Sequence, residues 1–338
     1  MKLSVIIPTR NRSALLEKAL ESLLAQTLSQ ENFEVIIVDN GSTDNTFNIV
    51  TSFKSDLKNI RYFLEHQPGL HVGRHKGCVE AQTDLLVYAD DDIEAFPTWL
   101  QAIKESFDDA DVVLVGGKCL PKFEAAPPEW LNAMWSPNPL GERILGHLSV
   151  IDLGDDTKPV NPDYIYGCNF AIRRSVLLDA GGFHPDAMPQ ELIRFRGDGE
   201  TFVSRYVQNM GYKALYNPLA SIYHWVPTDR MTTEYFCRRV YNQGISDSYT
   251  EIRSARGATC SSLTKILRTV SRIARGLVLH IKDRESIVSE EAALSRTLAV
   301  AYQTGYVYHQ AQVKESPELL AWVLKPDYWD CQITEGLS

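Results

Sequence analysis

Residues 85–94 of the chain read LLVYADDDIE, in which a short apolar run ends at three consecutive aspartates. The run at 85–88 has the length and residue types of a buried strand, and such strands do not normally end in stacked like charges unless the end faces water or a cation. Asp90 and Asp92 can point to the same side of an extended backbone and share a hard divalent ion, Mg²⁺ or Mn²⁺. The alternative is a solvated acidic turn that complements the positive end of a helix beginning near Phe96.

The composition is that of a globular protein with a sizeable core. The chain has 338 residues, 44% of them hydrophobic and 23% charged, which suffices for one large domain or two moderate ones. A formal net charge of −9 argues against broad nucleic-acid binding. The six cysteines form no CxxC pair and no apolar run nears 18 residues, so we expect reduced thiols, a cytoplasmic setting and no membrane span.

Apolar strand-like runs alternate with helical patterns through the first hundred residues. The runs at 3–7, 33–38, 60–64 and 85–88 are each followed by a polar loop and a segment with helical spacing. This alternation predicts an α/β fold with a mainly parallel sheet covered by helices on both sides. Because ligands bind beyond the carboxyl ends of such strands, the loops at 8–12, 39–44 and 90–94 are the ones expected to build a site. Residues 121–162 are proline-rich with little periodicity, and we expect a long binding loop there.

Four of these segments carry motifs in a fixed order. VIIPTRNR at 5–12, VIIVDNGSTDNT at 35–46, GLHVGRHKG at 69–77 and YADDD at 88–92 together resemble the family-2 glycosyltransferases, which have the GT-A nucleotide-diphospho-sugar transferase fold. The resemblance covers about the first 95 residues. It implies that Asp39 hydrogen-bonds the base, that Arg74 reaches the nucleotide or its diphosphate, that Asp90 lies near the ribose and that Asp92 binds the metal.

Further donor-side residues follow from the same resemblance. Pro8, Thr9 and Arg10 would line the nucleotide pocket. Asp91 is counted with them, although it points to the opposite side of an extended backbone and a structural role is its alternative. His75 stands where the family often has asparagine, so no role is assigned to it.

The second half of the chain resembles the family's acceptor side. YGCNFAIRR at 166–174 and GGFHP at 181–185 precede RGDGET at 196–201, which departs from the family's usual Glu-Asp pair. Glu200 or Asp198 would be the general base, with a lean towards Glu200, and helix capping is the alternative for either. His224 follows a late strand and would complete the metal shell together with Asp92 and Asp90.

The pattern divides the chain into two regions. We expect a catalytic GT-A domain at 1–225, made of a nucleotide-sugar-binding half (1–117) and an acceptor-side half (118–225), and a helical C-terminal region at 226–338. A helix expected at 263–281 is apolar on one face and basic on the other. It would either touch the inner face of a membrane or pack on its neighbours with a solvated basic face.

The function that the resemblance implies is metal-dependent, inverting hexosyl transfer. The donor would be a nucleotide-diphosphate sugar, with a UDP-sugar favoured, and the acceptor a glycan or lipid-linked hydroxyl in polysaccharide or glycoconjugate biosynthesis. Two alternatives stay open. A sugar nucleotidyltransferase would want a glycine-rich phosphate loop, which PTRNR lacks, and a non-catalytic nucleotide-sugar-binding protein is suggested by the altered motif near residue 198.

Overall fold

The structure is a computed structural model that describes residues 2–257 and 285–330. Within these residues an eight-stranded sheet has the order β10-β12-β6-β11-β4-β1-β2-β3. The strands are β1 (Leu3–Thr9), β2 (Phe33–Asp39), β3 (Ile60–Leu64), β4 (Leu85–Ala89), β6 (Val112–Gly116), β10 (Lys158–Pro159), β11 (Asn169–Arg173) and β12 (Lys213–Tyr216). Strands β1–β4 run parallel, β11 is antiparallel to both of its neighbours, and β12 is parallel to β6.

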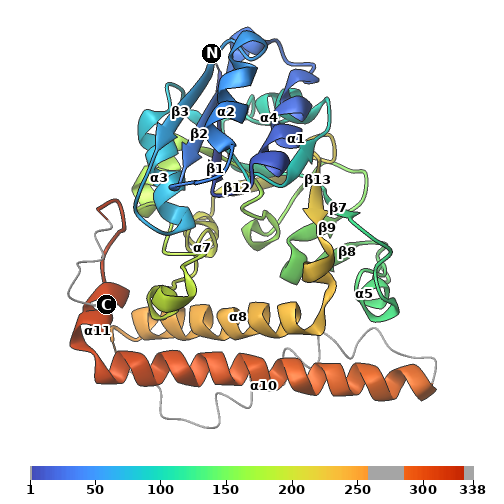
Figure 1. Cartoon of the computed structure of the whole chain (residues 1–338), viewed down its shortest axis with the longest axis vertical. Coiled ribbons are helices and arrows are strands. Elements are labelled where there is room, and N and C mark those ends of the chain that lie inside the picture. The colour runs from blue at the N-terminus through green and yellow to red at the C-terminus, as the bar shows by residue number, and fades with distance from the viewer. Residues whose placement is uncertain (1, 258–284, 331–338) are drawn as a thin grey trace.

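Helices cover both faces of this sheet because successive strand residues point to opposite sides. In β2, Val35 and Ile37 enter one core and Ile36 and Val38 enter the other. The first core includes residues of α1 (Ser13–Leu24), α2 (Thr46–Ser52) and α4 (Trp99–Ser106), and the second includes residues of α3 (Leu70–Glu80), α6 (Arg174–Ala180) and α7 (Thr201–Asn209). The predicted fold class is confirmed in this arrangement (Figure 1).

A second sheet includes three short strands from the segment that was expected to be a long loop. Its described strands have the order β5-β13-β7-β9-β8, with bounds β5 (Ile93–Ala95), β7 (Cys119–Phe123), β8 (Arg143–Leu145), β9 (Val150–Asp152) and β13 (Ile222–Val226). The short helix α5 (Glu129–Met134) lies between β7 and β8. The expectation of a loop at 121–162 is therefore wrong at these short elements, whose strands are too short to show a period of two, and the stretches at 124–128, 135–142 and 153–157 are irregular.

The C-terminal helices lie together below the catalytic fold in Figure 1. Helix α8 (Thr233–Ser254) packs along α10 (Glu285–Glu315), and α11 (Pro317–Val323) follows. Asp247 accepts a hydrogen bond from Tyr302 and Glu251 one from Tyr306, so α8 and α10 run parallel. No helix among the described residues is long and apolar enough to cross a membrane. The basic helix predicted at 263–281 lies outside the described residues.

Candidate active site

The three aspartates lie where the two sheets meet. Strand β4 of the large sheet ends at Ala89, and β5 of the second sheet begins at Ile93, so residues 90–92 form the crossing. His224 of β13 pairs with Ile93, and the neighbouring Trp225 N–H donates to the Asp92 carbonyl at 2.8 Å. The second sheet therefore carries the late histidine to the aspartates.

Asp90, Asp92 and His224 form a cluster that could hold a metal ion. One ligand atom from each lies within 4.8 Å of the others. The His224 Nδ1–H donates to the Leu148 carbonyl at 2.9 Å, which turns Nε2 towards Asp92 Oδ1 at 3.1 Å. Two carboxylates and an imidazole oriented by a backbone carbonyl are a donor set suited to Mn²⁺, and to Mg²⁺ through the carboxylates. The residues present thus fit the predicted ion.

Two arginines compensate the buried charge of Asp92. Arg230 lies 2.9 Å and Arg12 3.1 Å from Asp92 Oδ2. Burial alone would raise the pKa of Asp92, but His224, Arg230 and Arg12 lower it. Burial likewise opposes protonation of His224, yet the Asp92 charge raises its pKa to about 9. Asp92 and His224 therefore each favour the charged form of the other.

Asp91 has a different environment from its neighbours. Its carboxylate accepts from Thr9 Oγ1 at 2.7 Å and from Arg12 at 2.9 Å, so it ties the loop after β1 to the acidic segment. Burial raises the pKa of Asp91 to about 6, against the attraction of Arg12. Asp91 still lines the pocket, and its predicted contact with the donor stays a prediction.

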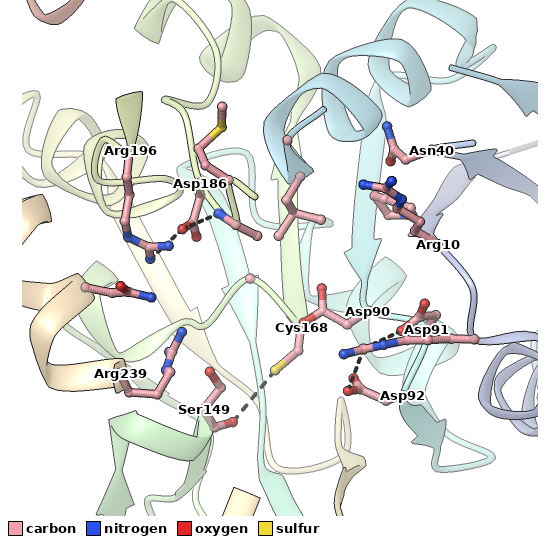
Figure 2. A pocket seen from close by; sticks show the side chains of 18 of the residues that line it. Arg10, Asn40, Asp90, Asp91, Asp92, Ser149, Cys168, Asp186, Arg196 and Arg239 are labelled. Atoms are coloured by element: carbon pink, nitrogen blue, oxygen red, sulfur yellow. Dashed lines mark hydrogen bonds and ion pairs between the residues drawn. The ribbon is translucent and has the colours of Figure 1, made fainter. Parts of the chain in front are cut away.

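The donor-side residues lie around a pocket of about 620 Å³. Pro8, Thr9, Arg10 and Asn40 line it beside the aspartates, as Figure 2 shows for Arg10 and Asn40. Asp39 is not among its lining residues. The Asp39 carboxylate is 2.7 Å from both the Tyr62 hydroxyl and the Ser42 N–H, which donate to it. The sequence places Asp39 at the right strand end, but the structure presents Asn40 to this cavity.

Arg74 connects the acidic segment to Glu200, which precedes α7. Its guanidinium is buried, 3.5 Å from Asp90 and 3.2 Å from Glu200. Burial would lower the pKa of Arg74, but Glu200 and Asp90 raise it. The Gly167 N–H donates to Glu200 at 3.2 Å, and a Cβ at residue 167 would lie 2.3 Å from Arg74 Nη2. A side chain at residue 167 would therefore displace the Arg74 guanidinium and the Glu200 carboxylate.

The two candidate bases lie in opposite surroundings. Glu200 lines the pocket with part of its side chain open to solvent. Asp198 is enclosed, and its carboxylate contacts His184, Arg205 and Thr250, each at 2.8 Å. The pocket therefore receives Glu200 and not Asp198.

Sequence reasoning missed several residues of this pocket. Arg230, four residues after β13, binds Asp92 with no sequence signal that would have found it. Arg12 belongs to the first motif, and its spacing alone did not distinguish a solvated charge from a partner of Asp91 and Asp92. Arg196, Arg238 and Arg239 also line the pocket.

Comparison with known proteins agrees with this geometry. The sequence model of glycosyl transferase family 2 matches residues 4–181. The chain is 40% identical over 103 residues to a validoxylamine A glucosyltransferase of Streptomyces hygroscopicus, a match of 30% of this chain and 24% of that protein. It is 24% identical over 249 residues to the glucosyl-dolichyl phosphate glucuronosyltransferase of Haloferax volcanii, covering 73% of this chain and 76% of that one.

A solved structure shares the fold. The mannosyltransferase of Pyrobaculum calidifontis superposes with a TM-score of 0.53 and 18% identity, over 98% of this chain and 88% of that one. The family match spans more than half of the chain and contains the loops that form the donor side of the pocket. The chain therefore belongs to glycosyl transferase family 2 and has the GT-A fold.

Proposed function

We propose that the protein moves a sugar, with inversion, from a nucleotide-diphosphate donor to an acceptor hydroxyl in a reaction that needs Mn²⁺ or Mg²⁺. The observation that carries the proposal is the cluster of Asp90, Asp92 and His224 in the same pocket as the partly exposed carboxylate of Glu200. The Pyrobaculum mannosyltransferase was solved with GDP-mannose and Mn²⁺, which supports this type of donor and ion. UDP is our favoured nucleotide.

The acceptor is proposed to be a glycan or a lipid-linked sugar in glycoconjugate or polysaccharide biosynthesis. The Haloferax relative is described as acting on glucosyl-dolichyl phosphate, and a Campylobacter jejuni relative, 34% identical over 125 residues, on an undecaprenol diphosphate-linked glycan. The Campylobacter match covers 35% of this chain and 38% of that protein. The acceptor therefore stands as our proposal and needs direct measurement.

Each pocket residue has its own role in the proposed single-displacement transfer. Glu200 takes the proton of the acceptor hydroxyl, and the hydroxyl oxygen bonds to the anomeric carbon as the bond from that carbon to the diphosphate oxygen breaks. Arg74 and the Gly167 N–H hold Glu200 in place. Arg10 and Thr9 line the donor side, where a cationic group and a hydroxyl suit phosphate oxygens. A divalent ion, when bound, would neutralise the charge that develops on the departing nucleotide.

Labelled donors provide the direct test. The full chain would be incubated with UDP- and GDP-sugars and Mn²⁺, with and without EDTA, and free sugar and nucleotide would be measured. We expect slow metal-dependent hydrolysis of one donor without acceptor and faster release with it. Binding without turnover would indicate the non-catalytic alternative.

Replacement of Asp92 by asparagine tests the metal site. Asp92→Asn should lower metal-dependent turnover by about 10²-fold or more, because the mutant lacks a charged ligand. It should also lose about 1–3 kcal/mol of stability, because Arg12 and Arg230 lose their counter-charge. Mn²⁺ titration, circular dichroism and donor turnover measure the three effects.

The control makes the same chemical change outside the pocket. Asp155→Asn removes an exposed carboxylate that binds Lys118 and should leave turnover unchanged. Wild-type Mn²⁺-dependent turnover in a folded Asp92→Asn protein would exclude Asp92 as a metal ligand.

A further inference from the structure

The pocket has a second wall, which the proposed reaction does not use. Arg238, Arg239 and Asn242 of α8 line it, and Arg196 lies next to them. Figure 2 shows Arg196 and Arg239 on one side of the pocket and Asp90, Asp91, Asp92 and Arg10 on the other. We call Arg238, Arg239 and Asn242 the α8 wall.

The α8 wall carries positive charge without a carboxylate partner. Elsewhere in the pocket, Arg12 and Arg230 bind Asp92, Arg74 binds Asp90 and Glu200, and Arg196 binds Asp186 at 2.5 Å. Among the side chains that the structure describes, those of residues 2–257 and 292–330, no carboxylate lies within ion-pair distance of the two α8 arginines. The Arg238 guanidinium lies 5.4 Å from the centre of the Tyr235 ring, and Arg239 Nε donates to the His147 carbonyl at 3.2 Å.

The charge of Arg239 affects the pKa of two neighbouring groups, Arg196 and His147. Burial lowers the pKa of Arg196, and Arg239 lowers it further, against the attraction of Asp186. Burial and Arg239 together lower the pKa of His147 to about 4. Because Arg196 and Arg239 lie on the same side of the pocket and repel each other, an anion bound near both would relieve the repulsion.

We infer that the α8 wall binds a phosphate group carried by the acceptor. Two guanidinium groups and one amide supply enough N–H donors for the three outer oxygens of a phosphate, and a planar guanidinium binds such oxygens in pairs. The wall faces the donor side across the pocket, so its ligand belongs to the second substrate. The inference rests on the proposed function, since it assigns this wall to the acceptor of that reaction.

The test measures phosphate binding with the donor side filled. The full chain would be saturated with UDP and Mn²⁺ and titrated by calorimetry with α-glucose 1-phosphate or with methyl α-glucoside. The wild type should bind the phosphate and not the neutral sugar. The double variant Arg238→Gln/Arg239→Gln should bind the phosphate about tenfold to a hundredfold more weakly and keep its affinity for UDP.

Matched controls separate this effect from net charge and folding. Lys54→Gln/Lys58→Gln also removes two positive charges, from exposed residues outside the pocket, and should bind phosphate as the wild type does. Arg238→Gln alone changes an exposed side chain and should show part of the loss without a change in melting temperature. Arg239→Lys keeps the charge and should bind better than Arg239→Gln.

Two further arms locate the phosphate. Sedimentation with phosphatidylcholine vesicles that contain undecaprenyl phosphate, compared with vesicles that contain phosphatidylglycerol, distinguishes a lipid-borne phosphate from a soluble one. Unchanged phosphate binding in a folded double variant would overturn the inference. The inference would also be overturned if the double variant lost affinity for UDP-glucuronate but not for UDP-glucose. That result would place the arginines on the donor sugar. A protein that binds phosphate but neither UDP nor Mn²⁺ would contradict the proposed function instead.

Discussion

Glu200 and Asp198 show how a single glycine separates two carboxylates that are two residues apart. Gly199 between them has φ +56°, and a Cβ there would lie 3.1 Å from the Asp186 Cβ. This left-handed residue lets the chain turn sharply, so Glu200 faces the pocket while Asp198 points into a buried polar cluster. This separation indicates a catalytic role for Glu200 and a structural role for Asp198.

The matched amide substitutions should therefore have opposite effects. Glu200→Gln should lower kcat by about 10²–10⁴-fold, because the acceptor proton loses its base, with a smaller loss of stability than Asp198→Asn, because Arg74 keeps Asp90 as a charged partner. Asp198→Asn should lower the free energy of unfolding by about 1–3 kcal/mol, because Arg205 and His184 lose a charged partner. Turnover at 20 °C measures the change in kcat, and urea unfolding measures the change in the free energy of unfolding.

Comparing the loss of turnover with the loss of stability in each variant shows whether Glu200 or Asp198 is the general base. Mn²⁺ affinity should match the wild type in Glu200→Gln, which separates loss of the base from loss of the metal. A stable Asp198→Asn protein without turnover, beside an active Glu200→Gln protein, would assign the base to Asp198.

Several site residues could be predicted at the residue scale from their place beside a strand. Asp90 and Asp92 follow β4, whereas His224 lies within β13 of the second sheet, and the structure brings the three together. The choice between Asp198 and Glu200 depends on the conformation of Gly199, which no pattern of residue types specifies. Arg230 could not be predicted, because its contact with Asp92 depends on how two sheets meet.

At the scale of elements, the parallel strands could be predicted and the second sheet could not. Strands β1, β2 and β4 are buried on both faces and appear in the sequence as continuous apolar runs. Strands β8 and β9 have three residues each, and β7 contains Pro121, so they show neither alternation nor a long run. Strands β8 and β9 pair locally with each other, but β7 pairs with β13 about a hundred residues later in the chain, and tertiary packing selects that partner.

The contact between α8 and α10 depends on two glycines. A Cβ at Gly244 would lie 2.2 Å from the Tyr302 carbonyl oxygen, and one at Gly305 would lie 2.0 Å from the Tyr241 carbonyl oxygen. Both obstacles are backbone atoms, which cannot move aside as a side chain can. The two helices therefore pack closely because neither residue has a side chain.

Gly244→Ala should separate these helices despite the better helix propensity of alanine. We expect a loss of about 1–3 kcal/mol in the free energy of unfolding, because the added methyl group overpacks the contact. Urea unfolding followed by circular dichroism measures it. The control is Gln243→Ala, an exposed neighbour on the same helix. If Gly244→Ala is as stable as this control, the close approach of the helices is not needed.

At the scale of the whole molecule, the end of the described chain returns to the first half of the fold. His75 Nε2 accepts a hydrogen bond from the Phe183 N–H at 2.8 Å, and its ring stacks on Trp329 at 4.1 Å between ring centres. Arg253 of α8 donates to the Lys325 carbonyl at 2.7 Å. These contacts fasten α3, which carries Arg74, to the C-terminal helices, so stability of the C-terminal region supports the geometry of the pocket.

Buried neutral histidines make the whole molecule sensitive to acid. Burial is the main cause that lowers the pKa of His71, His75, His147, His184 and His309, to about 3 for His75 and about 4 for His147 and His309. The unfolded chain takes up protons at these residues near pH 6.5, whereas the fold resists them. The free energy of unfolding should therefore fall as the pH drops from about 6.5 towards 4, by up to about 1.4 kcal/mol per pH unit for each histidine.

His224 and Asp91 change the free energy of unfolding in the opposite direction, and so they set the pH range in which the acid-induced loss appears. The pKa of His224 is raised to about 9, so its contribution grows as the pH falls from 9 and is complete below about 6.5, where it adds no slope. Asp91, with a pKa of about 6, gains a proton in the fold before it does in the unfolded chain and offsets one histidine between about pH 6 and 4. Urea unfolding at pH 7.5, 6.5 and 5.5 should show a net loss of stability at the lowest pH.

His309→Gln isolates one member of this group. His309 is fully buried in α10, and its Nδ1 lies 2.8 Å from the Ser248 hydroxyl, a contact that a glutamine amide can replace. Because the variant cannot bind the extra proton when unfolded, it should lose about 1 kcal/mol less than the wild type between pH 6.5 and 5.5. Parallel stability curves for the two proteins would show that His309 titrates alike in the folded and unfolded chains, and the acid sensitivity would then have to come from other groups.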